Sequence, residues 1–192
     1  MNTYKILVTG VSISGKSNLA RMLEIDFSEH FLPITNKDVD WDKDALIVPQ
    51  DSRIYILQTP KGCKTEAEHG ILLTCFDKIL YSDPDMETYT ELLASRGCAW
   101  FKEGVVEKGL DIDPEPSSLD KLSGIFGRIL GYALKKEKLR SEDMAYFKRA
   151  NLMGRVVVLK PAIENKNYLS FEGYPTMLEQ IVEEVRSKQY DP

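Results

Sequence analysis

Eight consecutive residues near the amino terminus carry the strongest chemical signal in the chain. They are Gly10, Val11, Ser12, Ile13, Ser14, Gly15, Lys16 and Ser17, and they satisfy G-x-x-x-x-G-K-[ST] at every fixed position. The two glycines permit backbone conformations and close approaches that a Cβ atom would obstruct, so successive N–H groups can turn inward around an anion. Lys16 is expected to reach the β- and γ-phosphates of a nucleoside triphosphate, and the Ser17 hydroxyl to ligate Mg²⁺. We call residues 10–17 the phosphate loop.

The residues on either side of the phosphate loop predict the strand-to-helix context that the motif requires. Residues 4–9 form a short apolar run, typical of a strand that is buried on both faces of a parallel sheet. After the loop, Leu19, Met22, Leu23 and Phe27 recur at helical spacing. The amino end of that helix would add its positive dipole end to the anion site.

Further strands and helices are expected to alternate along the chain. Apolar runs predict strands at 45–48, 53–57, 78–81 and 155–159. Helical patterns and caps predict helices at 65–76, at 87–96 with an end at Gly97, from Ser117 or Ser118 to Leu134, and from the capping-box pattern Thr176-Met177-Leu178-Glu179 onward. This order predicts an α/β fold, in the form of a three-layer α/β/α sandwich with a mainly parallel sheet.

Three glycines inside the third expected helix need a separate explanation. Gly124, Gly127 and Gly131 recur at spacings of three and four residues. Glycine destabilises a helix, so such a row favours a helix face that another backbone approaches closely, with a ligand surface as the alternative.

The composition limits the classes of function. The length of 192 residues and the 43% hydrophobic content suggest one domain, spanning residues 1–192. The net charge of −5 does not indicate a nucleic-acid-binding surface, and no apolar run approaches the roughly 18 residues of a membrane span. Cys63, Cys75 and Cys98 are odd in number and widely spaced, so they are expected to be reduced thiols of a cytoplasmic protein.

The phosphate loop resembles that of the P-loop NTPase superfamily. Within that superfamily, the stretch from Lys78 to Thr88 followed by Arg96-Gly97 is similar to nucleoside and nucleotide kinases of the thymidylate kinase kind. The resemblance implies a lid at 97–116 that closes over the phosphates, and we expect the lid to be mobile. Its candidate cations are Arg96, Lys102 and Lys108.

The same resemblance implies catalytic roles in the segment that follows the apolar run at 45–48. Kinases of this kind have an acidic residue followed by arginine at the end of a strand, and the nearest match is Asp51-Ser52-Arg53, which has an extra serine. We therefore expect an ATP-dependent (or GTP-dependent) phosphotransferase that acts on a small molecule, either a nucleoside or a nucleotide. Lys16, Asp51 and Arg53 are its expected catalytic residues. Asp51 would orient or deprotonate the acceptor, and Arg53 would contact it.

A GTPase-like regulatory protein with decayed motifs is the alternative. In that interpretation residues 45–57 form an antiparallel hairpin, Thr35 is a switch threonine, and Gln58 replaces a metal-linked aspartate. The identity of the acidic residue that completes the Mg²⁺ site also stays open. The cluster of Asp40, Asp42 and Asp44 is either a metal or substrate contact or a solvated acidic loop.

Overall fold

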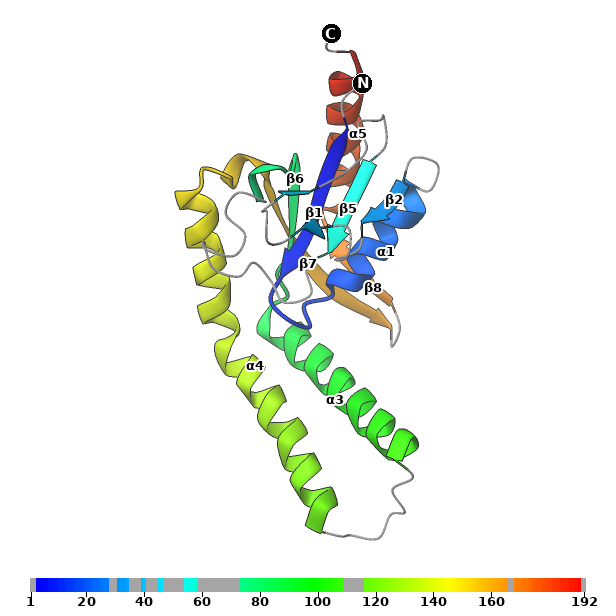
Figure 1. The fold of residues 1–192 in the computed structure, drawn as a ribbon, viewed down its shortest axis with the longest axis vertical. Coiled ribbons are helices and arrows are strands. Elements are labelled where there is room, and N and C mark those ends of the chain that lie inside the picture. Colours follow the sequence, from blue (N-terminus) through cyan, green and yellow to red (C-terminus); the bar gives the residue numbers. More distant parts are fainter. Residues whose placement is uncertain are drawn as a thin grey trace.

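The computed structural model describes residues 3–27, 31–34, 39–40, 45–46, 54–58, 73–108, 116–165 and 168–190. The strands are β1 (Tyr4–Gly10), β2 (Phe31–Ile34), β3 (Val39–Asp40), β4 (Ala45–Leu46), β5 (Ile54–Gln58), β6 (Lys78–Ser82), β7 (Val156–Asn165) and β8 (Tyr168–Glu172). The helices are α1 (Lys16–Asp26), α3 (Met86–Lys108), α4 (Pro116–Arg149), a short 3₁₀ turn at Met153–Arg155, and α5 (Tyr174–Tyr190). Figure 1 shows their arrangement.

The central sheet is mixed and has the strand order β2-β5-β1-β6-β7-β8. Strands β2, β5, β1, β6 and β7 pair in parallel, and β8 pairs antiparallel with β7. The predicted α/β class is confirmed. Strand β8 was not predicted, and β7 is longer than the expected strand at 155–159 because it continues into the hairpin with β8.

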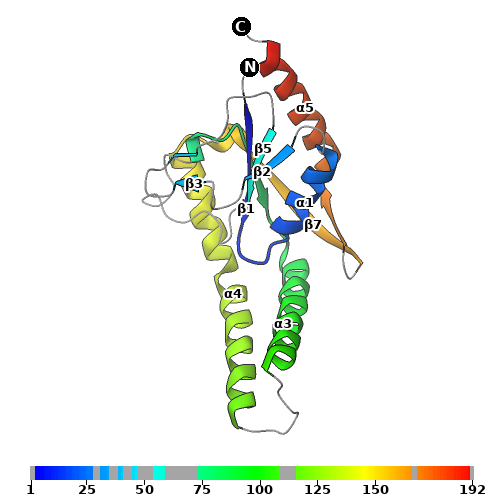
Figure 2. The same ribbon diagram turned by 45° about the vertical axis from the view of Figure 1, so that its right-hand side comes forward.

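Apolar residues cover both faces of the sheet. In β1 the side chains of Ile6 and Val8 belong to a core cluster with residues of α1 and α5, whereas Leu7 belongs to a second cluster. The second cluster contains Tyr146 and Phe147 from the end of α4. Successive residues of a strand point to opposite faces, so α1 and α5 lie on one side of the sheet and the end of α4 lies on the other (Figure 2).

Helices α3 and α4 lie side by side and extend together beyond the sheet (Figures 1 and 2). We call this antiparallel pair the arm. The helix predicted to end at Gly97 continues to Lys108, so its predicted end is wrong. Residues 109–115 of the candidate lid lie outside the described residues.

The glycine row of α4 does not contact another backbone. In the part of the chain that the structure describes, a Cβ atom added at Gly124, Gly127 or Gly131 would meet nothing within 4 Å, so the predicted close approach is wrong there. The glycine in close contact is instead Gly97 of α3, where a Cβ atom would lie 2.3 Å from Cδ1 of the Ile129 side chain. The absence of a side chain at Gly97 therefore allows α3 to pack closely on α4.

Four further points concern single elements. Helix α4 begins at Pro116, close to the predicted cap, but it runs on to Arg149. Helix α5 begins at Tyr174, so Thr176 lies inside the helix and is not its cap. The hairpin at 45–57 that the GTPase-like alternative requires is absent from the described part of this region, because β4 pairs with β3, and β5 pairs in parallel with β1 and β2. Of the expected helix at 65–76, only the last residues are described.

None of the described helices is both long enough and apolar enough to span a membrane.

Candidate nucleotide-binding site

The phosphate loop lies at the carboxyl edge of the sheet, between the end of β1 and the start of α1. Gly10 pairs with Ser82 at the end of β6, and Val8 pairs with Gln58 at the end of β5. The chain leaves β1 toward the β2–β5 side and later crosses to β6 and β7 on the other side. Parallel sheets bind ligands at such a change of direction, beyond the carboxyl ends of the strands.

The two fixed glycines occupy positions that exclude a side chain. Gly10 has φ 136°, and a Cβ atom there would lie 2.4 Å from the carbonyl oxygen of Ser82. Gly15 has φ 88° and immediately precedes α1, and its Cβ atom would lie 2.7 Å from Cδ1 of Leu169. Positive φ and close contact both require glycine, as the motif led us to expect.

The loop between these glycines is held in a strained conformation. Ile13 has φ 64°, which is a true outlier for a β-branched residue. Such strain persists only where the surroundings fix the backbone. Here the hydroxyl of Tyr89 in α3 donates to the carbonyl oxygen of Ser12 at 2.9 Å. The hydroxyl of Ser82 donates to the carbonyl oxygen of Ser14 at 2.5 Å. The arm and β6 thus both hold the phosphate loop.

The amino group of Lys16 lies inside the loop. Its Nζ donates to the carbonyl oxygens of Gly10 at 3.0 Å and Val11 at 2.6 Å, and the residue is only 5% exposed. A buried ammonium group needs such partners because its desolvation is costly. A phosphate in the loop would give the same ammonium group a negatively charged partner.

Ser17, the predicted Mg²⁺ ligand, is exposed in the first turn of α1. Its hydroxyl accepts a hydrogen bond of 3.0 Å from the side-chain amide of Gln58, which ends β5. Gln58 entered the sequence-based predictions only within the GTPase-like alternative. The amide nitrogen of Gln58 faces the Ser17 hydroxyl, and an amide nitrogen is not a Mg²⁺ ligand, so the hydroxyl is the oxygen donor that this pair offers to the metal.

A second charged cluster lies directly after β6. Asp83 is 8% exposed, and its Oδ2 accepts a hydrogen bond of 2.5 Å from Nε of Arg140. Nζ of Lys136 lies 3.6 Å from Oδ1 of Asp83, 2.9 Å from Oε1 of Glu137 and 5.8 Å from the ring centroid of Tyr89. The hydrogen bond and the charge of Asp83 raise the pKa of Arg140. The cluster brings two cations of α4 to the strand end beside the phosphate loop.

Asp143 adds a buried carboxyl group to the same side of α4. It is 6% exposed and accepts a hydrogen bond of 2.8 Å from the hydroxyl of Tyr81. Burial raises the pKa of Asp143 to about 6, although the Tyr81 hydrogen bond and the charge of Lys16 both lower it. Of the charges that act on Asp143, that of Lys16 comes from the phosphate loop.

Three charged residues of α4 were not among the predicted site residues. Lys136, Arg140 and Asp143 stand in a stretch of mixed charges that is typical of a solvated helix, so neither the burial of Lys136 and Asp143 nor the ion pair of Arg140 left a signal in the sequence. Asp51 and Arg53, the predicted acceptor-binding pair, lie outside the described residues, as do Thr35 and the acidic residues Asp42 and Asp44. Of Asp40 only the place in β3 is described.

The predicted lid cations lie on α3. Arg96 is exposed in the middle of this helix, and Lys102 and Lys108 belong to its outer part, where side chains are not described. All three residues therefore belong to the arm.

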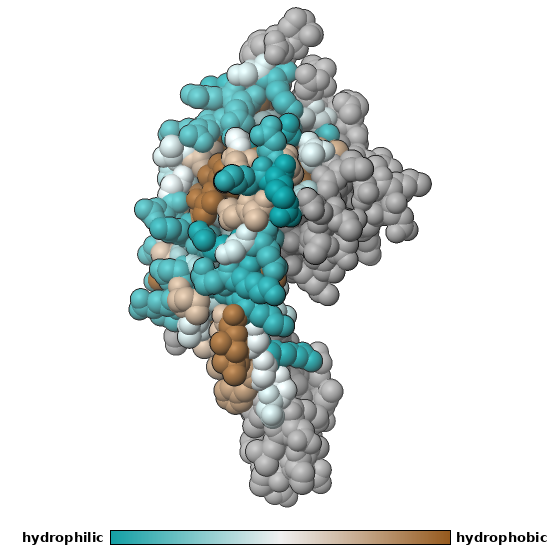
Figure 3. Space-filling model, turned by 90° about the vertical axis from the view of Figure 1, so that its left-hand side faces the viewer, coloured by the Kyte–Doolittle hydropathy of each residue, from teal (hydrophilic) through white to brown (hydrophobic). Residues whose placement is uncertain are grey.

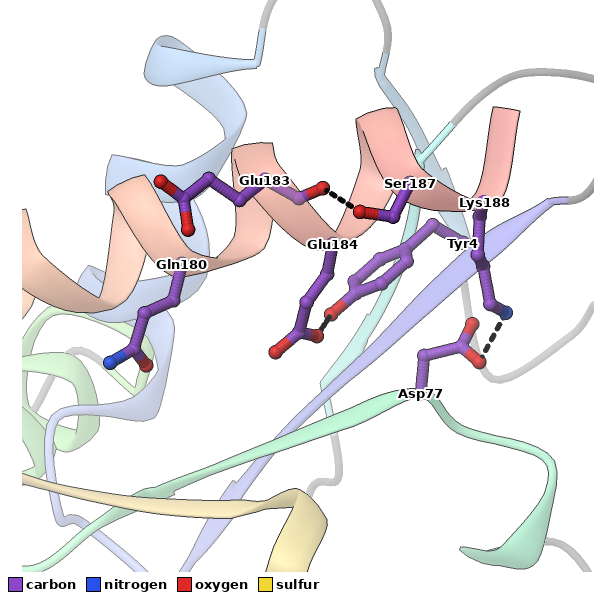
Figure 4. A pocket seen from close by; sticks show the side chains of 7 residues that line it. All are labelled: Tyr4, Asp77, Gln180, Glu183, Glu184, Ser187 and Lys188. Atoms are coloured by element: carbon purple, nitrogen blue, oxygen red, sulfur yellow. Dashed lines mark hydrogen bonds and ion pairs between the residues drawn. The ribbon is translucent and has the colours of Figure 1, made fainter. Parts of the chain in front are cut away.

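A pocket lies at the opposite end of the sheet, and several of the side chains that line it pair with one another (Figure 4). Glu184 of α5 accepts a hydrogen bond from the hydroxyl of Tyr4 and pairs with Lys78, with 2.5 Å between Nζ and Oε1. Lys188 pairs with Asp77, also at 2.5 Å. Burial and then the carboxylate of Glu184 raise the pKa of Tyr4. These contacts tie α5 to the amino ends of β1 and β6 and leave the carboxyl edge as the stronger candidate site.

No protein-family model matches the chain, and no curated protein matches it.

Proposed function

We propose that this protein binds the triphosphate of ATP or GTP with Mg²⁺ and transfers the γ-phosphoryl group to a small acceptor, a nucleoside or a nucleotide. The proposal includes the three-layer α/β/α architecture of the P-loop NTPase type, which the apolar clusters on both faces of the sheet support. The observation that carries the proposal is the conformation of the phosphate loop. Gly10, Ile13 and Gly15 all have positive φ, and Lys16 points its ammonium group into the loop.

The chain's own residues divide the work of binding between them. The loop amides and Lys16 would hold the β- and γ-phosphates, and the amino end of α1 would add its dipole. Ser17 would hold Mg²⁺, which supplies charge neutralisation of the transferring group. Phosphoryl transfer depends chiefly on positioning and electrostatics. We therefore propose that the phosphate loop, in the position that the fold gives it, catalyses the transfer.

The transfer step needs an acceptor hydroxyl in line with the γ-phosphorus. The bond between the γ-phosphorus and its bridging oxygen breaks, a new bond forms to the acceptor oxygen, and the acceptor proton passes to a base. Asp51 keeps the proposed role of base, with Arg53 as acceptor contact. Lys136 and Arg140 supply further positive charge at the same edge of the sheet, and Asp83 holds them there.

The GTPase-like alternative has less support. It required residues 45–57 to form an antiparallel hairpin, whereas β4 pairs with β3 and β5 runs parallel to β1 and β2. We also propose a cytoplasmic location, with which the free thiol of Cys98 accords.

The test is incubation of the full chain with Mg·ATP or Mg·GTP and a panel of nucleosides and nucleotides, followed by detection of phosphorylated acceptors. We expect one class of acceptor to be phosphorylated with stoichiometric release of the nucleoside diphosphate. Slow hydrolysis with a strong preference for GTP, and no transfer to any acceptor, would instead favour the regulatory alternative.

A further inference from the structure

The arm packs on the phosphate loop through a small apolar cluster. Val11 of the loop is buried against Tyr89 and Leu93 of α3, and the partly buried side chain of Ile13 packs on the same group. The remaining members come from α4 and are Ile129, Tyr132 and Ala133. We call these seven residues the loop–arm cluster. Two variable positions of the phosphate-loop motif are therefore in contact with the arm.

The loop–arm cluster is distinct from the hydrophobic surface that the arm shows to solvent. Phe126, Leu130 and Leu134 of α4 are exposed, and Figure 3 shows brown hydrophobic surface on the arm. Tyr89 and Leu93 are each only 1% exposed. The side of the arm that packs on the phosphate loop is therefore a buried one, and the exposed residues take no part in this contact.

A hydrogen bond from the loop–arm cluster selects the orientation of one peptide plane of the loop. The hydroxyl of Tyr89 donates to the carbonyl oxygen of Ser12 at 2.9 Å. Burial raises the pKa of Tyr89 to about 12, so the hydroxyl keeps its proton and stays a donor at neutral pH. In a planar trans peptide the C=O group and the following N–H group point in opposite directions. The N–H group of Ile13 therefore points away from Tyr89.

The same hydrogen bond opposes the strain at Ile13. A β-branched residue rarely adopts the left-handed conformation that Ile13 has, with φ 64°, so the loop needs an outside contact to keep it. Relaxation of Ile13 to a negative φ would turn the 12–13 peptide and its N–H group to a different direction. The bond from Tyr89 to Ser12 stabilises the strained orientation against this change.

Tyr89 can hold the loop because its own position is fixed. It lies in the first turn of α3, where Asp85 caps the helix: its Oδ1 accepts from the N–H group of Thr88 at 2.8 Å, and its carbonyl oxygen accepts from the N–H group of Tyr89 at 2.9 Å. Nζ of Lys136 lies 5.8 Å from the centroid of the Tyr89 ring. A rigid support of this kind keeps a binding group in one orientation before its ligand arrives.

We propose that Tyr89 is a positioning residue for triphosphate binding, whose hydroxyl holds the 12–13 peptide so that the N–H group of Ile13 faces the phosphates. Inward-facing N–H groups of such a loop are the groups that bind the anion. This inference rests on the proposed function of the phosphate loop. Tyr89 acts through Ser12, so it sets the fraction of molecules whose loop is ready to bind, and the apparent affinity follows that fraction.

Isothermal titration of the full chain with Mg²⁺ and non-hydrolysable analogues of ATP and GTP tests the role of Tyr89. Tyr89→Phe keeps the buried ring and removes only the hydroxyl, and its Kd should rise about fivefold, the ratio that loss of one hydrogen bond typically produces. Tyr132→Phe is the matched control, because it removes another hydroxyl from the loop–arm cluster and leaves the bond to Ser12 in place. Its Kd should equal that of the unaltered chain. The melting temperature of each variant checks that it is folded.

The same titration in an Ile13→Gly chain separates positioning from a general loosening of the fold. Glycine adopts a positive φ without strain, so the loop no longer needs the hydroxyl, and Tyr89→Phe should raise the Kd less than about twofold in this background. A Tyr89→Phe variant that binds as tightly as the unaltered chain, or one that loses the same affinity in both backgrounds, would overturn the role of Tyr89 and leave the proposed function standing. Absence of binding by the unaltered chain would overturn the proposed function, and the inference with it.

Discussion

Nε of Arg140 in α4 lies 2.5 Å from Oδ2 of Asp83, the first residue after β6. This ion pair and the neighbouring contact with Lys136 fix the middle of α4 over the carboxyl edge of the sheet. Ser82 pairs with Gly10 of the phosphate loop. Asp83, which follows Ser82 and holds α4, therefore lies next to that loop. The position of the arm and the conformation of the loop therefore depend on the same short segment.

Replacement of Asp83 by alanine should destabilise the protein strongly. Lys136 is 2% exposed and would lose Asp83, the more buried of its two carboxylate partners. Breaking a buried pair by removing one partner typically costs about 3 kcal/mol or more, and we expect that loss in the free energy of unfolding measured with urea. Glu137→Ala, whose side chain is 62% exposed, is the control and should cost less than about 1 kcal/mol. Equal effects of the two variants would contradict the role of Asp83.

Glycines of the loop and of the arm should respond oppositely to alanine. Gly10→Ala places a Cβ atom against the backbone of Ser82 at a positive φ, so it should lower the free energy of unfolding by more than about 2 kcal/mol. Gly124→Ala fills open space in a helix and should raise it by about 0.5–1 kcal/mol. Denaturant unfolding of both variants at low protein concentration checks the pair. Destabilisation by Gly124→Ala would show a close contact that the structure lacks.

The buried carboxyl group of Asp143 should make stability depend on pH in a predictable direction. Its pKa is about 6 in the folded protein, above the ordinary value of about 3.9, so the folded state disfavours the charged form. The resulting cost is absent below about pH 4, grows between pH 4 and 6, and reaches about 3 kcal/mol above pH 6.

Asp143→Asn removes this charge and can keep the oxygen acceptor for Tyr81. The variant should be more stable than the unaltered protein at pH 7, and the difference should vanish as the pH falls from 6 to 4. Chemical unfolding at several pH values measures the difference. Glu142→Gln, an exposed neighbour, serves as control and should change stability by less than about 0.5 kcal/mol throughout. A constant advantage of Asp143→Asn at every pH would show that its origin is not ionisation.

Local patterns in the sequence predicted the elements around the phosphate loop, because each of these depends on neighbouring residues. The run at 4–9, Gly10, Gly15 and the helix after Lys16 all have the expected form. The end of α3 was not predictable in the same way. Gly97 ends many helices, but here its missing side chain serves packing on Ile129, which is distant in sequence.

The charged groups of the candidate site depended on the tertiary fold and were missed for that reason. Lys136, Arg140 and Asp143 are separated from Asp83 and Tyr81 by more than 50 residues, and nothing local distinguishes them from solvated charges. Long-range pairing, rather than residue type, decides such positions. Strand β8 did leave a local signal, because its buried Leu169 and Phe171 alternate with Tyr168, Ser170 and Glu172, but this signal was overlooked.

The affinity for a Mg²⁺-bound nucleoside triphosphate directly tests whether residues 10–17 bind phosphate. Isothermal titration with a non-hydrolysable triphosphate should show binding by the unaltered chain and by Lys138→Ala, an exposed control with a side chain 76% accessible. Lys16→Ala should bind at least about 100-fold more weakly, since it removes the ammonium group that lies inside the loop. Ser17→Ala, at an exposed position that should leave the fold intact, should lose the dependence of affinity on Mg²⁺. Folded Lys16→Ala and Ser17→Ala variants that bind as tightly as the control, or no binding by the unaltered chain, would contradict the assignment of the phosphate loop.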